Sequence, residues 1–380
     1  MKIGVIGQGY VGFPLAQISA NSGFKVIGYD INSEVISRLH NTNPNLELTN
    51  DPELLTNCDI YVIAVPTPLD KFNKPDLSYV ISASNIISKY AIKESLVINE
   101  STSFPGTLRE VILPIIEKSV KGVLFASAPE RIDPDNKTWN LSNTTRVVGG
   151  LTNEATLKAA NFYKSFCKEV FLASSPEVAE SAKLLENTYR QINIAFINQF
   201  AQIMDNLSIP VTEVIEAAST KPFGFMKFSP GLGVGGHCIP IDPIYLAEKA
   251  ELVGAPTSII RLANEINTTA HRYAFNKISE FFDNDLINKK ICLVGLSYKP
   301  NTSDLRESPS LLLWDLLIES GVDLSYHDSF HPTFRGQQSV AISENLFDLS
   351  ILAIRHNDLD FDLLKRHSKK IFNCAGNYFI

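Results

Sequence analysis

The sequence has 380 residues, a formal net charge of −7, and a composition of 44% hydrophobic and 20% charged residues. This length predicts two or three domains, and the composition excludes intrinsic disorder and collagen-like repeats. Because an acidic chain has no general attraction for phosphate backbones or anionic lipids, we expect no nucleic acid and no membrane among its partners.

Cysteine usage and the N-terminus indicate the compartment. The five cysteines are odd in number, far apart and without C-x-x-C spacing, at Cys58, Cys167, Cys238, Cys292 and Cys374. This pattern argues against disulfides and against a structural metal, and it favours a reducing cytoplasm. The chain opens on "MKIGVIG" without signal-peptide features, and no run reaches the roughly 18 apolar residues of a membrane span. We therefore expect a cytoplasmic protein that is neither exported nor anchored.

The first part of the chain alternates strand and helix patterns. Residues 2–12, "KIGVIGQGYVG", predict a buried strand, a glycine turn and a helix start, and "FKVIGYD" predicts the next strand. Further strands are expected at 58–66, 95–101, 123–130, 146–150 and 168–173, several of them apolar runs typical of parallel strands covered on both faces. Residues 1–174 are therefore expected to form a doubly wound, Rossmann-like domain.

One long helix is predicted next, in residues 174–207. Serines and Pro176 suit its first turn, and no breaker follows until Pro210. At 1.5 Å per residue it would span roughly 45 Å, which suits a helix that joins domains or subunits. We assign residues 175–284 to a central helical domain, interrupted by the glycine-rich segment "GLGVGGHCIPIDP" at 231–243.

From residue 288 the strand and helix alternation restarts. Strands are expected at 289–298, 322–328, 349–354 and 370–374, with a helix at 308–320. Residues 285–380 are therefore expected to form a second α/β domain. The predicted fold is two doubly wound Rossmann-like domains joined by a central helical region that contains the long helix.

The glycine turn near the N-terminus indicates a dinucleotide site. Gly7, Gly9 and Gly12 form G-x-G-x-x-G between a predicted strand and helix, where a pyrophosphate can approach the helix N-terminus. Asp30 ends the second strand, near the spacing of a carboxylate that binds ribose hydroxyls, and no basic residue follows it until Arg38. NAD is therefore favoured over NADP. The alternative is a glycine turn used only for packing.

Cys238 is placed unlike the other cysteines, for which buried packing is the default interpretation. Its segment can form neither a long helix nor a central strand, and we expect the preceding glycines to leave backbone N–H groups pointing into a cleft. Such donors would stabilise a thiolate or the oxyanion of a covalent adduct. Asp242 could orient a water or the thiol, or only cap a turn. His237 is equally a substrate contact or a satisfied polar group.

Other polar residues could meet this cysteine. Lys183 and Asn187 lie one turn apart on the long helix, where a partly desolvated lysine would serve acid/base chemistry, although a lone lysine is by default solvated. Ser101 and Thr102 in "NESTSFPGT" and Glu130 in "APERIDP" sit at predicted strand ends. Ligands of open α/β sheets bind beyond such ends, although each residue could be a cap or a surface acid.

These motifs together resemble the UDP-glucose/GDP-mannose dehydrogenase family of nucleotide-sugar 6-dehydrogenases. The form "GGHCIPIDP" is similar to the branch that oxidises UDP-N-acetylhexosamines, whereas UDP-glucose enzymes usually carry serine or tyrosine before the cysteine and lysine before the aspartate. The resemblance covers almost the whole chain, through "GQGYVGFPLA", "AVPTPLD", "ESTSFPGT", "APERIDP", "AKLLENTYRQINIAFINQ", "PGLGVGGHCIPIDP" and "GLSYKPNTSDLRESPS".

The resemblance implies a four-electron oxidation of the sugar C6 alcohol to a carboxylate by two NAD⁺. Cys238 matches the nucleophile that captures the C6 aldehyde as a thiohemiacetal, which then becomes a thioester. A thiol adduct holds an aldehyde that would otherwise leak or hydrate. The remaining catalytic matches are Lys183 and Asn187 for the oxyanions, Asp242 and Thr102 for the catalytic water, and Glu130 as the acid assigned to thioester hydrolysis.

The resemblance also implies binding residues. Lys299 matches a nucleotide-sugar contact, and Arg306 matches one that reaches the cofactor across the domain cleft; without the resemblance, Arg306 and Glu307 would read as a solvated charge pair. Arg261 matches a substrate arginine from the neighbouring subunit, which implies an obligate dimer, or a higher homo-oligomer, built on the long helix. Matches to cofactor contacts are Gly7, Gly9, Tyr10, Val11, Gly12, Asp30, Thr67 and Thr102.

Some positions depart from the family pattern, and several functions stay open. Asp135 stands where a glycine is usual, "AIRHNDL" replaces a more familiar strand end, and the chain ends early at Ile380. UDP-N-acetylglucosamine, UDP-N-acetylgalactosamine and UDP-N-acetylmannosamine are all candidate substrates, with UDP-glucose as an alternative. The rivals are a two-electron β-hydroxyacid dehydrogenase and a non-catalytic nucleotide-binding or thiol-sensing protein. The family suggests that the uronate product serves polysaccharide biosynthesis.

Overall fold

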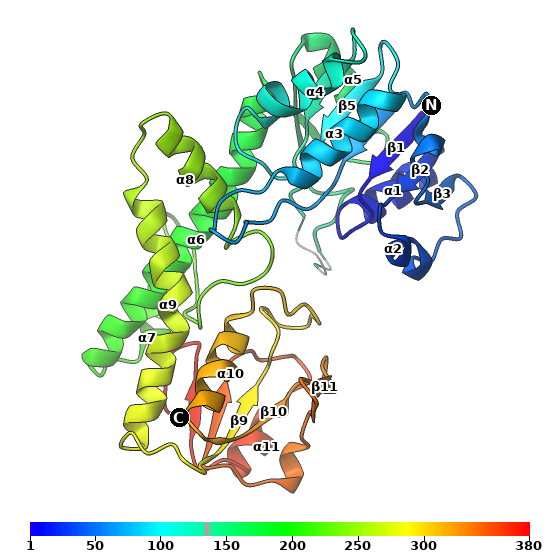
Figure 1. The fold of residues 1–380 in the computed structure, drawn as a ribbon. Coiled ribbons are helices and arrows are strands. Elements are labelled where there is room, and N and C mark those ends of the chain that lie inside the picture. The colour runs from blue at the N-terminus through cyan, green and yellow to red at the C-terminus, as the bar shows by residue number, and fades with distance from the viewer. Residues whose placement is uncertain (133–135, 137) are drawn as a thin grey trace. The chain divides into compact units, whose positions relative to one another are not determined.

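The computed structural model describes residues 1–132, 136 and 138–380 and forms two compact units (Figure 1). The first unit contains Met1–Glu186 and Ile244–Ala255, and the second contains Asn187–Pro243 and Pro256–Ile380. Asp135 lies outside the described residues. In the part of the chain that the structure describes, no helix is both long and apolar enough to cross a membrane.

The first unit contains an eight-stranded sheet in the order β3-β2-β1-β4-β5-β6-β7-β8. All neighbours are parallel except β6 and β7, which are antiparallel. The predicted doubly wound sheet is therefore confirmed. The strands are β1 (Lys2–Ile6), β2 (Lys25–Tyr29), β3 (Leu46–Thr49), β4 (Ile60–Ile63), β5 (Leu96–Asn99), β6 (Leu124–Ser127), β7 (Arg146–Gly150) and β8 (Val170–Leu172).

Helices cover both faces of this sheet, which explains the apolar runs of β4 and β5. Leu15 of α1 and Phe162 of α5 pack on one face, and Val80 of α3 and Ile116 of α4 pack on the other. The helical segments of this unit are α1 (Gly12–Asn21), α2 (Ser33–Arg38), η1 (Pro52–Leu55), α3 (Ser78–Tyr90), the π-helix η2 (Leu108–Ile112), α4 (Leu113–Glu117) and α5 (Asn153–Lys164).

The predicted long helix is confirmed as α6 (Pro176–Asn206). Its 31 residues span roughly 46 Å at 1.5 Å per residue. It ends before Pro210, which precedes the first residue of the next helix. The helices that follow are α7 (Val211–Ser219), α8 (Asp242–Leu252) and α9 (Ser258–Phe281).

The second unit contains a parallel four-stranded sheet in the order β10-β9-β13-β14, and its strands lie in the regions where strands were predicted. Ile278 of α9 and Trp314 of α10 pack on one face, and Leu364 of α11 packs on the other. The elements are β9 (Lys290–Val294), α10 (Pro309–Glu319), β10 (Asp323–His327), the hairpin β11 (Thr333–Phe334) and β12 (Gln337–Gln338), η3 (Ile342–Glu344), β13 (Leu349–Leu352), α11 (Phe361–Arg366) and β14 (Ile371–Asn373).

Candidate active site

The glycine turn between β1 and α1 is tight at two positions and open at the third. A Cβ on Gly7, whose φ is +93°, or on Gly12 would overlap a backbone carbonyl oxygen, whereas a Cβ on Gly9 would meet no atom within 4 Å. No side chain caps the first turn of α1, which follows Val11. An open glycine before an uncapped helix N-terminus is the geometry that accepts a pyrophosphate, so the turn fits NAD.

Asp30 is held at the carboxyl end of β2 beside this turn. Its Oδ2 accepts the backbone N–H of Gln8 at 2.8 Å, and its Oδ1 accepts the N–H of Asn32 at 2.9 Å. A carboxylate has about four lone-pair sites, so two backbone donors leave acceptor capacity for hydroxyl groups. The position of Asp30 therefore fits the predicted ribose contact.

The ends of β4 and β5 are tied together by Ser101. Its hydroxyl accepts the N–H of Val65 at 2.9 Å and donates to the Val65 carbonyl at 2.8 Å. Thr67 is buried on the segment after β4, and Thr102 follows Ser101 after β5. Both predicted cofactor contacts thus lie on segments joined beyond the carboxyl ends of parallel strands, where ligands of such sheets bind.

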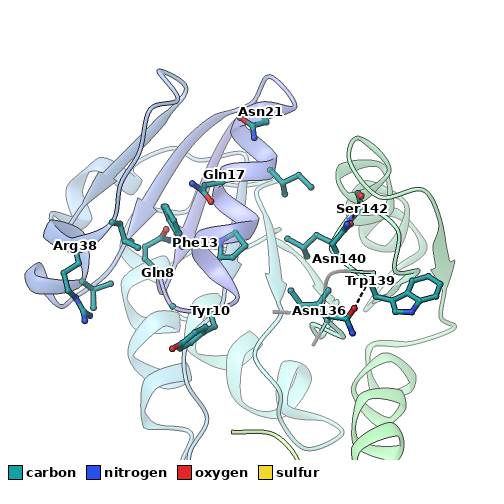
Figure 2. Close-up of a pocket in the computed structure, with 17 residues that line it drawn as sticks. Gln8, Tyr10, Phe13, Gln17, Asn21, Arg38, Asn136, Trp139, Asn140 and Ser142 are labelled. Atoms are coloured by element: carbon teal, nitrogen blue, oxygen red, sulfur yellow. Dashed lines mark hydrogen bonds between the residues drawn. The ribbon is translucent and has the colours of Figure 1, made fainter. Parts of the chain in front are cut away.

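A pocket of about 880 Å³ runs along α1 (Figure 2). It reaches the glycine turn at Gly9 and Tyr10, but Asp30, Thr67 and Thr102 are not among its lining residues. The pocket therefore differs from the predicted set of cofactor contacts. Its lining is Gln8, Gly9, Tyr10, Phe13, Pro14, Gln17, Ile18, Asn21, Val35, Arg38, Leu39, Ile132, Asn136, Trp139, Asn140, Leu141 and Ser142.

The Glu130 carboxylate is buried and held by N–H donors. Its Oε2 lies 2.5 Å from a guanidinium nitrogen of Arg146, and its Oε1 accepts the backbone N–H groups of Arg131 at 2.6 Å and Ile132 at 2.8 Å. Glu130 is therefore neither a helix cap nor a surface acid, the two alternatives to a functional role. The donors fix the direction of its carboxylate.

Arg146 joins Glu130 to a second buried carboxylate, which the sequence interpretation missed. A guanidinium nitrogen lies 3.7 Å from Glu100, the Tyr163 hydroxyl donates to Glu100, and the guanidinium stacks 4.7 Å from the centroid of the Tyr163 ring. Burial raises the pKa of Glu100 to about 7, with Arg146 lowering it and Glu130 raising it. An arginine in the otherwise apolar strand "RVVGG" was the available signal, because a buried guanidinium needs carboxylate partners.

Helix α6 carries two buried charged groups. Lys183 is 8% exposed, and no hydrogen-bond or ion-pair partner for its ammonium is found in the described part of the chain. Glu180, which the sequence interpretation missed, accepts the N–H groups of Gly106 at 2.7 Å and Leu108 at 3.1 Å and the hydroxyl of Ser127 at 2.9 Å. Lys183 is thus not a solvated surface lysine, and Glu180 ties α6 to the turn after "ESTSFP".

The five cysteines fall into two groups by burial, as predicted. Burial raises the pKa of Cys58 to about 11 and that of Cys292 to about 12, and it also raises those of Cys167 and Cys374. All four are buried, which confirms that they pack as small apolar groups. Cys238 alone among the five is half-buried.

The Cys238 segment turns directly into α8. The Cys238 carbonyl accepts the N–H groups of Ile241 at 3.1 Å and Asp242 at 2.9 Å, and Asp242 is the first residue of α8. The buried Asp242 carboxylate accepts the amide N–H of Asn187 at 2.5 Å. The second unit therefore brings Asn187, Cys238 and Asp242 together, as the sequence pattern requires of a shared site.

The expectation about the glycines before Cys238 is wrong for Gly236. Its N–H donates to the Arg306 carbonyl at 2.9 Å and does not point into a cleft. A Cβ on Gly235 would lie 2.6 Å from Cβ of Tyr298, and one on Gly236 would lie 2.9 Å from the Tyr298 ring. These two glycines therefore allow the cysteine segment to pack against the loop after β9.

The remaining predicted contacts of the second unit lie as follows. Arg306 forms a bidentate pair with Asp304, at 2.9 Å and 2.6 Å, in place of a pair with Glu307. Burial and the Arg306 charge lower the pKa of His237, which favours a neutral ring. The Lys299 ammonium lies 5.6 Å from the centroid of the Tyr298 ring, and Arg261 is half-buried on α9.

The doubly wound sheet, the glycine turn with Asp30, and the half-buried thiol define a dinucleotide-binding dehydrogenase. No group of three or more histidine, cysteine, aspartate or glutamate side chains that could hold a metal occurs in the described ranges. The chain belongs to the UDP-glucose/GDP-mannose dehydrogenase family: the NAD binding domain of that family matches residues 1–46 and 40–167, its central domain 177–269, and its UDP binding domain 292–368. These matches confirm the prediction that the chain is an NAD-dependent nucleotide-sugar dehydrogenase with NAD as its cofactor.

Full-length relatives are similar over almost the whole chain. Protein CapL of Staphylococcus aureus is 37% identical over 94% of this chain and 90% of its own length. UDP-N-acetyl-D-glucosamine 6-dehydrogenase of Pseudomonas aeruginosa is 32% identical over 94% of this chain and 91% of its own. The solved structure of the UDP-D-ManNAc dehydrogenase of Pyrococcus horikoshii has a TM-score of 0.88 and 31% identity, and covers 99% of this chain and 95% of that chain.

Proposed function

We propose that this chain is a UDP-N-acetylhexosamine 6-dehydrogenase that oxidises the C6 alcohol of its substrate to a carboxylate. The observation that carries the proposal is a half-buried cysteine, Cys238, whose backbone carbonyl accepts the N–H of Asp242, the residue whose carboxylate accepts the Asn187 amide. The "GGHCIPIDP" segment and relatives named for UDP-N-acetylglucosamine and UDP-N-acetylmannosamine support the substrate class. UDP-glucose is the alternative substrate.

In the proposed reaction, one alcohol, one water and two NAD⁺ give one carboxylate, two NADH and three protons. Loss of one C6 hydride and of the hydroxyl proton first converts the alcohol to the aldehyde. The Cys238 sulfur then forms a bond to C6 of the aldehyde, and the aldehyde oxygen takes up a proton, which gives a thiohemiacetal. Loss of the remaining C6 hydride and of the hydroxyl proton leaves a thioester. Water then attacks the thioester carbon, the C–S bond breaks, and the carboxylate and the thiol are released.

Each of the other catalytic residues has a place in this scheme. Lys183, a buried ammonium, and the Asn187 amide stabilise the oxyanions that form at C6. Asp242 and Thr102 hold the water, and Glu130, whose carboxylate direction is fixed by Arg146 and two backbone N–H groups, acts in hydrolysis of the thioester. The burial of Lys183 and the hydrogen bonds of Asn187, Asp242 and Glu130 support their roles.

Binding residues complete the proposal. Bound NAD⁺ supplies the acceptor for a hydride in each of the two oxidation steps. The residues that would hold it are the cofactor matches named above, with the open side of Gly9 toward the pyrophosphate and Asp30 toward the ribose. Arg306 is a further proposed cofactor contact. Lys299 and His237 contact the nucleotide sugar. The proposed domains are residues 1–174 for NAD, 175–284 for the helical centre, and 285–380 for the UDP-sugar.

We also propose a homodimer, or a higher homo-oligomer, built on α6. This helix exposes large apolar side chains, with Leu185 at 67% and Phe196 at 61% exposure, and α9 exposes Ile259 at 68%. Exposed apolar side chains that form a contiguous patch mark association surfaces. In this assembly Arg261 serves the neighbouring subunit's substrate. Light scattering after gel filtration tests the proposal: Phe196→Glu should shift the mass toward one chain, and a parent that is already monomeric would overturn it.

The proposed location is the cytoplasm, in agreement with the buried, unlinked cysteines, and the proposed use of the uronate is polysaccharide biosynthesis. The decisive test of the function counts the NADH formed per molecule of sugar, by absorbance at 340 nm, across a panel of UDP-sugars. Two NADH per UDP-N-acetylhexosamine support the proposal. One NADH indicates a two-electron β-hydroxyacid type of enzyme, and none with any nucleotide sugar indicates a non-catalytic binding or thiol-sensing protein.

A further inference from the structure

A buried carboxylate connects the carboxyl ends of β9 and β10 in the second sheet by hydrogen bonding. Asp328 directly follows β10 and is 1% exposed. Its Oδ2 accepts the N–H of Leu296, just beyond β9, at 2.7 Å, and its Oδ1 accepts the N–H of Phe330 at 2.8 Å. Burial opposes the charge, but hydrogen bonds from His356, Leu296 and Phe330 hold the pKa of this carboxyl below its usual range. Asp328 is therefore an anionic anchor at the carboxyl end of the sheet.

His356, beyond the end of β13, connects this anchor to another loop. Its Nε2 lies 3.3 Å from Oδ2 of Asp328, and its Nδ1 accepts the backbone N–H of Asn301 at 2.9 Å. The carboxylate requires a proton on Nε2, and the Asn301 N–H requires a bare Nδ1, so the two contacts select one neutral tautomer. The ring is buried, with the Phe330 ring centroid 4.7 Å away.

Asn301 makes a second hydrogen bond to the segment that follows β13. Its backbone is in the left-handed region, with φ at +60°, and its Oδ1 accepts the N–H of Asn357 at 2.9 Å. The loop between β9 and α10 is therefore held at Asn301 by two neighbouring residues, His356 and Asn357. Lys299, the proposed nucleotide-sugar contact, lies two residues before Asn301 in this loop.

The same loop supports the cysteine segment. The Arg306 carbonyl accepts the Gly236 N–H, and the Tyr298 side chain packs on Gly235 and Gly236. A displacement of this loop would therefore move Lys299 first and would also disturb the segment that leads to Cys238. The loop also lies at the carboxyl edge of a parallel sheet, where such sheets bind ligands.

We infer that His356 is a positioning residue for the nucleotide: by accepting the Asn301 N–H it holds the Lys299 loop in the conformation that binds the uridine diphosphate group, and Asp328 selects the ring tautomer that can accept this N–H. Neither side chain needs to touch the ligand. The inference rests on the proposed role of Lys299. The two ring nitrogens of His356 have different roles, because Nδ1 contacts the loop at Asn301, whereas Nε2 contacts Asp328.

Two conservative replacements of His356 test the contacts of its two ring nitrogens separately in the full-length enzyme. In His356→Asn the side-chain oxygen can take the place of Nδ1 and accept the Asn301 N–H, whereas in His356→Gln the amide can take the place of Nε2 and leaves that N–H without its acceptor. We expect UDP, titrated by calorimetry, to bind His356→Asn within about twofold of the parent and His356→Gln about fivefold more weakly, since one lost hydrogen bond is worth about 1 kcal/mol. With the UDP-sugar, KM should rise in the Gln variant more than kcat falls.

His367 provides the matched control. Its Nδ1 bonds the Asn345 carbonyl at 2.8 Å, in the same unit but away from the Asn301 loop, so His367→Gln should leave UDP binding unchanged. Equal UDP affinities for His356→Asn and His356→Gln, or a weaker Asn variant, would overturn the inference. A parent enzyme that does not bind UDP would instead refute the proposed function, so the two failures are distinguishable.

Discussion

Replacing Gly236 by alanine tests whether the cysteine segment is fixed by close packing against the loop after β9. The φ of Gly236 is +80°, and its Cβ would lie 2.9 Å from two carbons of the Tyr298 ring. The left-handed conformation costs about 1–2 kcal/mol in a non-glycine residue, and overpacking costs about 1–3 kcal/mol. The free energy of unfolding should therefore fall by roughly 2–5 kcal/mol.

Differential scanning calorimetry measures this loss as a fall in Tm. At about 2–4 °C per kcal/mol for a unit of this size, Gly236→Ala should lower Tm by at least about 4 °C. Two controls separate the causes. Gly231→Ala meets no atom within 4 Å and has no positive φ, so it should be neutral, whereas Gly224→Ala, with φ at +68° and open space, should show the conformational cost alone. Equal Tm values for the variants at 236 and 231 would refute the reasoning.

The two buried carboxylate sites give further predictions. Arg146→Met leaves two buried carboxylates without their guanidinium and should cost about 3–5 kcal/mol in urea unfolding. Adding Glu100→Gln should recover part of that loss, and full additivity of the two losses would contradict the shared network. Burial raises the pKa of Glu180 to about 7, above its unfolded value, so this group stabilises the fold at low pH and loses that contribution as pH rises toward 7. Glu180→Gln should therefore weaken the decline of Tm between pH 5 and 7, and an unchanged decline would contradict the assignment.

Strands with strong apolar runs were predictable, and strands defined by pairing were not. The runs of β4 and β5 are buried on both faces, and α6 continues because no proline or glycine interrupts it. In contrast, β3 is only partly buried, and the hairpin of β11 and β12 has two-residue strands, so neither leaves an apolar pattern. The antiparallel direction of β7 depends on its partner, which strand periodicity does not encode.

Residues close in sequence were recognised as a site more readily than residues brought together by folding. The turn from Cys238 to Asp242 is local, and its motif was informative. Arg146 meets Glu100 across 46 positions, and Asp328 meets His356 across 28, so one sequence contains no signal that pairs them. The expectation of an N–H pointing into a cleft at Gly236 was wrong because the partner, the Arg306 carbonyl, comes from a distant loop.

The central claim is that the Cys238 sulfur bonds to the substrate carbon during turnover. Rapid acid quenching of the enzyme with NAD⁺ and a UDP-N-acetylhexosamine, followed by peptide mass spectrometry, measures this bond directly. We expect a sugar adduct on the peptide that contains Cys238, with no adduct and no carboxylate product in Cys238→Ser. Carboxylate formed by the serine variant at the parent's rate, without any modified peptide in the parent, would contradict it.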